Sequence, residues 1–184
     1  MTAKPPSHVY YFEVGAGTWR GTFTFRVTSW RAARRASIGL KNLLLVVTMQ
    51  ATQRIVGPSR LLSVVAAHPD EGEFGVADNR VELSALGLRL YDLRERYVLS
   101  PDGQGVKVSA HEHFGPVPVI LTRQFEYPAE IRSDGLGSTY HMPLLGSPWT
   151  ATYAVGDDRR SLAGTLVCDW AQADERATRD SRGT

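Results

Sequence analysis

The segment TWRGTFTFRVTSW, residues 18–30, holds the clearest secondary-structure signal in this chain. Within it, residues 22–27 alternate strictly between polar and apolar side chains in the order T-F-T-F-R-V. Successive side chains of a β-strand point to opposite faces of the sheet, so a period of two is typical of a half-buried strand. The segment therefore predicts a β-strand with one face against a hydrophobic core.

Segments of strand composition continue through most of the chain. HVYYFEV at residues 8–14 predicts a strand before the first, joined to it by the turn GAG at residues 15–17. Beyond Pro69, further strands are predicted at residues 72–83, 86–99, 106–114, 119–126, 138–142, 150–155 and 160–170. Turn residues separate them at intervals of about 8–12 residues, as in an all-β sandwich or barrel. We expect a mainly β fold with a single antiparallel barrel of about 8–10 strands, which leaves no exposed sheet edge.

Two segments depart from the strand pattern. In the segment of about residues 32–67, apolar side chains recur at steps of three and four, as on one face of a helix: Leu40, Leu43, Leu44, Val47, Ala51 and Ile55. Gly57 and Pro58 would end this helix, and residues 59–68 fit a second helix or an extended segment, of which we favour the helix. AQADERATR at residues 171–179 predicts a short C-terminal helix.

Length and composition bound the classes of protein to consider. The chain has 184 residues, 42% of them hydrophobic and 22% charged, which favours one globular domain over residues 1–184, with flexible ends at 1–7 and 178–184. The net charge of +2 is too small to indicate a nucleic-acid partner. The longest apolar run, LLLVV at residues 43–47, is far shorter than the roughly 18 residues of a membrane span. The N-terminal residues do not resemble a secretion signal, so a cytoplasmic location is expected.

The triplet Gly17-Thr18-Trp19 resembles the G-x-W signature of lipocalins and the wider calycin barrels. The resemblance implies that Gly17 permits a tight entry into the strand and that Trp19 packs across one end of the barrel against an arginine from a late strand. Arg159 or Arg160, at the start of the last predicted strand, would supply that arginine. The chain differs from lipocalins in its early helical segment, and its one cysteine leaves no internal disulfide. The resemblance therefore implies a lipocalin-like barrel and names no ligand.

The leading functional hypothesis is a binding protein for a small hydrophobic or amphipathic molecule, held in the barrel lumen. Barrels of about eight or more strands can enclose one such ligand. The candidate ligand-binding residues are Tyr91, Tyr140, Trp149 and Tyr153, although aromatic side chains more often belong to a core. No cofactor is expected, and a homodimer is considered. A filled barrel that serves only as an interaction module is a further alternative.

Histidines carry the second hypothesis, an enzyme built on the same barrel. VKVSAHEHF, residues 106–114, places His111 and His113 on one face of a strand and Val, Ala and Phe on the other. If the histidine face lines the lumen, these rings and His141 could transfer protons in an isomerase, cyclase or hydratase reaction. If the apolar face lines the lumen, the histidines lie on the wet surface, and we favour this orientation. Nothing nearby completes a metal motif, so no metal is expected.

Overall fold

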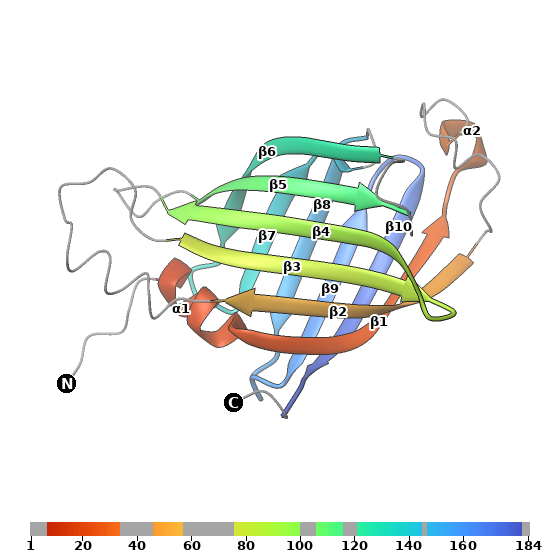
Figure 1. Cartoon of the computed structure of the whole chain (residues 1–184). Helices are drawn as coiled ribbons and strands as arrows, with labels where there is room; N and C mark the ends of the chain where they lie inside the picture. The colour runs from red at the N-terminus through yellow and green to blue at the C-terminus, as the bar shows by residue number, and fades with distance from the viewer. Residues whose placement is uncertain are drawn as a thin grey trace, which may run out of the picture.

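Ten antiparallel strands follow one another in sequence order around a closed barrel, and the last pairs with the first (Figure 1). The computed structural model describes residues 7–33, 46–56, 76–99, 106–115, 121–144 and 147–181. The strands are β1 (Gly17–Val27), β2 (Val46–Val56), β3 (Val76–Ala85), β4 (Leu88–Leu99), β5 (Val106–Phe114), β6 (Leu121–Ile131), β7 (Gly137–Met142), β8 (Trp149–Val155), β9 (Ser161–Val167) and β10 (Ala171–Arg179). The prediction of a mainly β fold with a single antiparallel barrel is confirmed.

Two short helices accompany the strands. α1 (Ser7–Gly15) covers one end of the barrel, and α2 (Trp30–Ala33) lies beyond the opposite end (Figure 1). Neither of these described helices is long and apolar enough to cross a membrane.

Alternation along the strands divides the lumen from the outer wall. In β5, Val106, Val108 and Ala110 are buried, whereas Lys107 and His111 are exposed. Most inward positions of the other strands are also apolar or aromatic, and together they form the main hydrophobic core. The period of two that predicted the strands therefore also separates the core side from the solvent side.

Trp19 joins α1 to the barrel wall. Its side chain is 0% exposed, and its indole Nε1 donates a hydrogen bond of 2.8 Å to the carbonyl of Gly15. Gly17, two residues earlier, has a φ of +131°, which favours glycine. The arginine beside the indole is Arg179 of β10, whose guanidinium carbon lies 4.7 Å from the ring centroid.

The choice of Arg159 or Arg160 as the partner of Trp19 is therefore wrong. Both side chains are exposed in the turn before β9, on the solvent side of the chain. Arg179 reaches the indole because Trp19 and Arg179 stand directly opposite each other in the β1–β10 pairing. Its guanidinium also donates a hydrogen bond to the carbonyl of Val14 in α1.

The strand predicted at residues 8–14 is instead part of α1. Tyr11 and Phe12 are adjacent in sequence, and both are buried. A strand would point these two rings to opposite faces, whereas one turn of helix turns both toward the barrel end. The ring of Phe12 lies 5.0 Å from that of Tyr97 on β4.

The predicted helical segment of about 32–67 is wrong over residues 46–56, which form β2. The apolar spacing was ambiguous, because Val47, Ala51 and Ile55 are four residues apart and so fit one helix face and also alternate inward positions of a strand. Gln53 also points inward, between Ala51 and Ile55, and this polar residue interrupts the alternation of polar and apolar side chains. Residues 34–45 and 57–67 of the segment lie outside the described residues.

The short C-terminal helix predicted at 171–179 is also wrong, because this segment is β10. Ala171, Ala173, Glu175 and Ala177 are buried, and the residues between them are exposed or half-buried. Alanine, glutamate and arginine favour helices in isolation, but pairing with both β1 and β9 satisfies this backbone and closes the barrel.

Candidate functional site

A small cavity lies in the centre of the barrel. Its volume is about 50 Å³, space for a few water-sized groups. We call it the lumen cavity, and its lining residues are Tyr11, Phe23, Gln53, Asn79, Val81, Leu83, Tyr91, Leu93, Glu95, Tyr97, Tyr140, Met142, Leu144, Tyr153 and Leu166. Three of the four predicted ligand-binding residues, Tyr91, Tyr140 and Tyr153, meet here.

Glu95 on β4 is the carboxylate of this cavity. Its Oε2 accepts hydrogen bonds of 2.7 Å from Asn79 Nδ2 and from the hydroxyl of Tyr97, and its Oε1 accepts one from the hydroxyl of Tyr127. Burial raises the pKa of Glu95, and the three donors oppose that rise. The carboxylate is thus held in one orientation by neighbours on β3, β4 and β6.

Two amide oxygens beside Glu95 accept no hydrogen bond from any of the residues that the structure describes. Asn79 is 5% exposed, and since its Nδ2 donates to Glu95, its Oδ1 is the atom left unpaired. Gln53 is 7% exposed, and its Oε1 is also unpaired. Buried polar atoms are nearly always hydrogen-bonded. Two unpaired acceptors beside one small cavity therefore indicate a site that a hydrogen-bond donor could occupy.

Glu175 is a second buried carboxylate, on β10. It is 1% exposed, and neither of its oxygens has a hydrogen bond of normal geometry in the part of the chain that the structure describes. Its pKa is raised to about 7: burial is the largest cause, the nearby hydroxyl of Tyr153 opposes the rise, and the negative charge of Glu95 adds to it. The side chain of Glu175 is therefore largely protonated below neutral pH.

Replacing Glu175 by glutamine should stabilise the protein by roughly 1–3 kcal/mol near pH 8 and change its stability little near pH 4. The folded state holds the Glu175 proton up to about pH 7, whereas the unfolded state releases it near the ordinary value of 4.5. Between the two pKa values, unfolding releases a proton, so the free energy of unfolding of the wild type falls as the pH rises. Glutamine at this position does not titrate, so the variant does not lose this stability.

Urea unfolding at both pH values measures the effect. Glu130→Gln, which alters an exposed carboxylate on β6, is the matched control and should show no gain. An equal effect of Glu175→Gln on stability at the two pH values would contradict a raised pKa of Glu175 in the folded protein.

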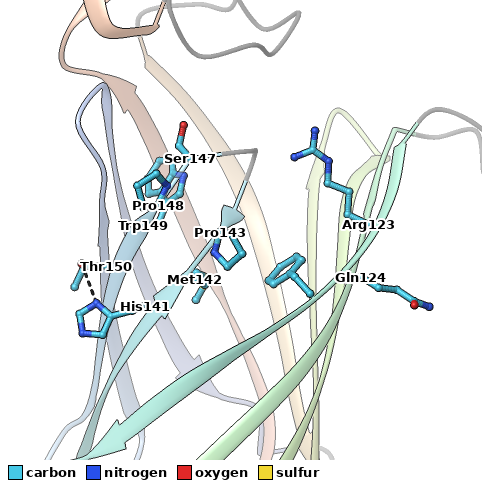
Figure 2. Close-up of a pocket in the computed structure, with 10 residues that line it drawn as sticks. Arg123, Gln124, His141, Met142, Pro143, Ser147, Pro148, Trp149 and Thr150 are labelled. Carbon is cyan, nitrogen blue, oxygen red and sulfur yellow. Dashed lines mark hydrogen bonds between the residues drawn. The ribbon is translucent and has the colours of Figure 1, made fainter.

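A larger opening lies in the barrel wall where β6 and β7 separate (Figure 2). These strands pair over only three residues, Ala129–Ile131 against Ser138–Tyr140, and diverge beyond them. We call the resulting space of about 670 Å³ the side cleft, and its lining residues are Arg123, Gln124, Phe125, His141, Met142, Pro143, Ser147, Pro148, Trp149 and Thr150. Trp149, the fourth predicted ligand-binding residue, is among them.

Apolar groups form most of the surface of the side cleft, although five of its ten lining residues are polar: Arg123, Gln124, His141, Ser147 and Thr150. Met142 at the end of β7 and Pro143 directly after it line the gap on one side, and the side chain of Gln124 points outward on the other (Figure 2). Arg123 lies at the rim and makes no hydrogen bond or ion pair with the other described residues (Figure 2). The indole Nε1 of Trp149 is buried and has no acceptor within the described ranges.

Met142 lines both the side cleft and the lumen cavity. Its side chain is buried, and methionine is unbranched and flexible, so it can adopt other rotamers within a packed wall. The two spaces therefore adjoin at one adaptable side chain.

The three predicted catalytic histidines lie outside the lumen. His111 is exposed and His113 half-buried on the outer face of β5, the orientation that the alternating pattern favours. His113 Nδ1 is 3.2 Å from Thr122 Oγ1, and His141 Nδ1 is 3.3 Å from Thr150 Oγ1. The structure does not bring the three rings together into a pocket.

His111 and His113 instead line a hollow of about 270 Å³ on the outer wall. Asp92 in this hollow is bound by arginines, with hydrogen bonds of 3.0 and 2.9 Å from Arg80. These contacts lower the pKa of Asp92 against the effect of its burial. Within the described residues, no group of three or more histidine, cysteine, aspartate or glutamate side chains could hold a metal ion.

The polar residues of the lumen were missed from the sequence, although a signal for them exists. Gln53, Glu95 and Glu175 each stand at an inward position of a strand whose neighbouring inward residues are apolar or aromatic. Once a strand is assigned, a polar residue on its core side indicates a buried polar site. The assignment of helices to residues 46–56 and 171–179 concealed two of these three positions.

Comparison with known proteins adds no family assignment. No protein-family model matches this chain, and no curated protein is significantly similar to it.

Proposed function

We propose that this protein is a lipocalin-like binding protein of the calycin type that takes a small, largely apolar molecule. The observation that carries the proposal is the side cleft of about 670 Å³ with its walls of Phe125, Met142 and Trp149. Sites for small organic ligands commonly measure about 300–1,000 Å³ and are lined by apolar and aromatic side chains with a few polar groups. The lumen cavity of about 50 Å³ is far below this range, so we place the body of the ligand in the cleft.

Two donors at the cleft suggest how the ligand is oriented. The indole N–H of Trp149 has no acceptor among the described residues, and the guanidinium of Arg123 stands at the rim. Both favour a ligand with a hydrogen-bond acceptor, a carbonyl or a carboxylate, beside its apolar part. Arg123 near the solvent side would attract a negative charge, and Trp149 would bind an oxygen deeper in the cleft.

The proton-transfer enzyme is the less favoured alternative. This hypothesis requires at least two of the three histidine rings inside a pocket, close enough for a hydrogen bond that is direct or bridged by one water. His111 and His113 instead lie on the outer wall of the barrel. The cytoplasmic location and the homodimer stay predictions from the sequence.

Binding of anilinonaphthalene sulfonate, an apolar anion that becomes fluorescent in apolar sites, tests the proposal. We expect saturable binding to the wild-type protein and about tenfold weaker binding to Trp149→Phe, because one hydrogen bond to a charged acceptor is lost. Arg123→Gln should also weaken binding, and more strongly at low salt.

Thr152→Ala is the matched control, because Thr152 is exposed on β8, the strand of Trp149, and is not among the residues that line the side cleft. Trp149→Phe keeps an aromatic ring at this buried position and should lower the free energy of unfolding by about 1–2 kcal/mol, because the smaller ring leaves part of the site unfilled. Equal affinity in all four proteins would show that the probe binds elsewhere and would contradict the cleft.

A further inference from the structure

Three side chains in the wall of the lumen cavity, Glu95, Gln53 and Asn79, present hydrogen-bond acceptors to it. Gln53 Oε1 and Asn79 Oδ1 are unpaired oxygens, and the Glu95 carboxylate receives three hydrogen bonds. A carboxylate has about four acceptor positions, so one remains for a further donor. Each of these three side chains therefore has at least one open acceptor position beside a space of about 50 Å³.

Strand register brings these three residues to one place. Asn79 on β3 stands directly opposite Glu95 on β4, and Gln53 on β2 stands opposite Val81, two residues along β3 from Asn79. Diagonal neighbours of this kind on the same face of a sheet are about 7–8 Å apart, within reach of a long side chain. The acceptors thus come from three consecutive strands and share the inner face.

The charge and the aromatic surroundings of the cavity favour a cation. None of the described residues that line it is lysine, arginine or histidine, so no positive side chain balances Glu95 there. The rings of Tyr91, Tyr97 and Tyr140 also line it, and the faces of aromatic rings attract cations. A neutral donor such as water would satisfy the oxygens but would leave the carboxylate charge unbalanced.

We propose that the lumen cavity binds a protonated primary amine, whose three N–H groups donate to Glu95, Gln53 and Asn79 beneath the tyrosine rings. An ammonium group offers three donors and no acceptor, so one N–H can reach each of the three acceptor side chains. The volume admits only a few non-hydrogen atoms. The amine is therefore either a small free alkylammonium ion or the end of a longer amine that passes Met142 from the side cleft. Binding of the longer amine rests on the proposed function of the side cleft, whereas binding of the small ion does not.

Calorimetric titration with methylammonium and with octylammonium chloride, at matched ionic strength, distinguishes these sources. Binding of both indicates a small free amine, and binding of octylammonium alone indicates the end of a longer amine. Tetramethylammonium carries the same charge without any N–H donor, and we expect it to bind at least about tenfold more weakly. Failure of both primary amines to bind, or equal binding of tetramethylammonium, would overturn the proposal.

Gln53→Met removes one unpaired acceptor and keeps the length of the side chain. This variant should be as stable as the wild type or more stable, because the Gln53 oxygen accepts no hydrogen bond from the described residues, and should bind the amine about tenfold more weakly. Glu95→Gln should bind more weakly still, and Gln50→Met, on the exposed side of β2, is the matched control with wild-type affinity.

Unchanged amine affinity in both Gln53→Met and Glu95→Gln would also overturn the proposal. The binding of anilinonaphthalene sulfonate to the same variants reports on the cleft separately, so failure of the amine site and failure of the proposed function are distinguishable.

Discussion

Replacing Trp19 by alanine should lower the free energy of unfolding by about 3–5 kcal/mol. The indole is 0% exposed, stands beneath the guanidinium of Arg179 and donates a hydrogen bond to the carbonyl of Gly15. The change removes a large buried aromatic group, leaves a cavity and deprives the Gly15 carbonyl of its donor. Because this one side chain contacts α1, β1 and β10, its loss should also loosen the helix from the barrel end.

Urea unfolding followed by circular dichroism measures this effect. Trp30→Ala is the matched control, because Trp30 is 36% exposed on α2 and lies outside the buried clusters. It should cost less than about 1 kcal/mol, as substitutions away from the core usually do. Similar losses for the two variants would show that Trp19 does not join α1 to the barrel.

The second large effect is expected at Gly21, where a single methyl group should destabilise the barrel closure by at least about 3 kcal/mol. A Cβ at this position would lie 1.9 Å from the carbonyl oxygen of Arg176 and 2.5 Å from the Cα of Ala177. Both are backbone atoms of β10, so the overlap cannot be relieved by rotating a side chain. Gly21→Ala should therefore separate β1 from β10, the pair that closes the barrel.

Gly87→Ala provides the comparison for Gly21→Ala. Gly87 has a φ of +76° but no atom within 4 Å of an added Cβ, so alanine there meets backbone strain and no collision. We expect a loss of about 1 kcal/mol from this strain. Thermal unfolding of both variants separates the two causes, and a loss at Gly21 no larger than at Gly87 would contradict a close approach of β1 and β10.

Where polar and apolar side chains alternate without interruption, the sequence was sufficient to predict the strand. Residues 22–27 and 106–110 show the plain alternation, and both are strands of the barrel. Prediction failed at β2 and β10, where Gln53 and Glu175 interrupt the apolar inward positions and the remaining residues fit a helix as well as a strand. A polar inward residue alone does not conceal a strand, because β3 and β4 were predicted although Asn79 and Glu95 point inward.

The candidate site was predictable only in part, for a related reason. Tyr91, Tyr140, Trp149 and Tyr153 stood out as large aromatic residues of strand segments, and the fold turns three of them to the lumen cavity and Trp149 to the side cleft. The side cleft itself depends on how few residues pair between β6 and β7, which no local pattern encodes. Neither Arg123 nor Met142 could be assigned to it without that register.

The indole signals of the four tryptophans give the most direct test of ligand binding at the side cleft. In a heteronuclear NMR titration of nitrogen-labelled protein with anilinonaphthalene sulfonate, the Trp149 signal should shift most and saturate, because its N–H gains an acceptor. The signal of Trp170, whose Nε1 already donates to Ser147 at the cleft, should shift less. Those of Trp19 and Trp30 should stay in place. Unchanged Trp149 and Trp170 signals at saturating probe, or a largest shift at Trp19 or Trp30, would contradict a binding site between β6 and β7.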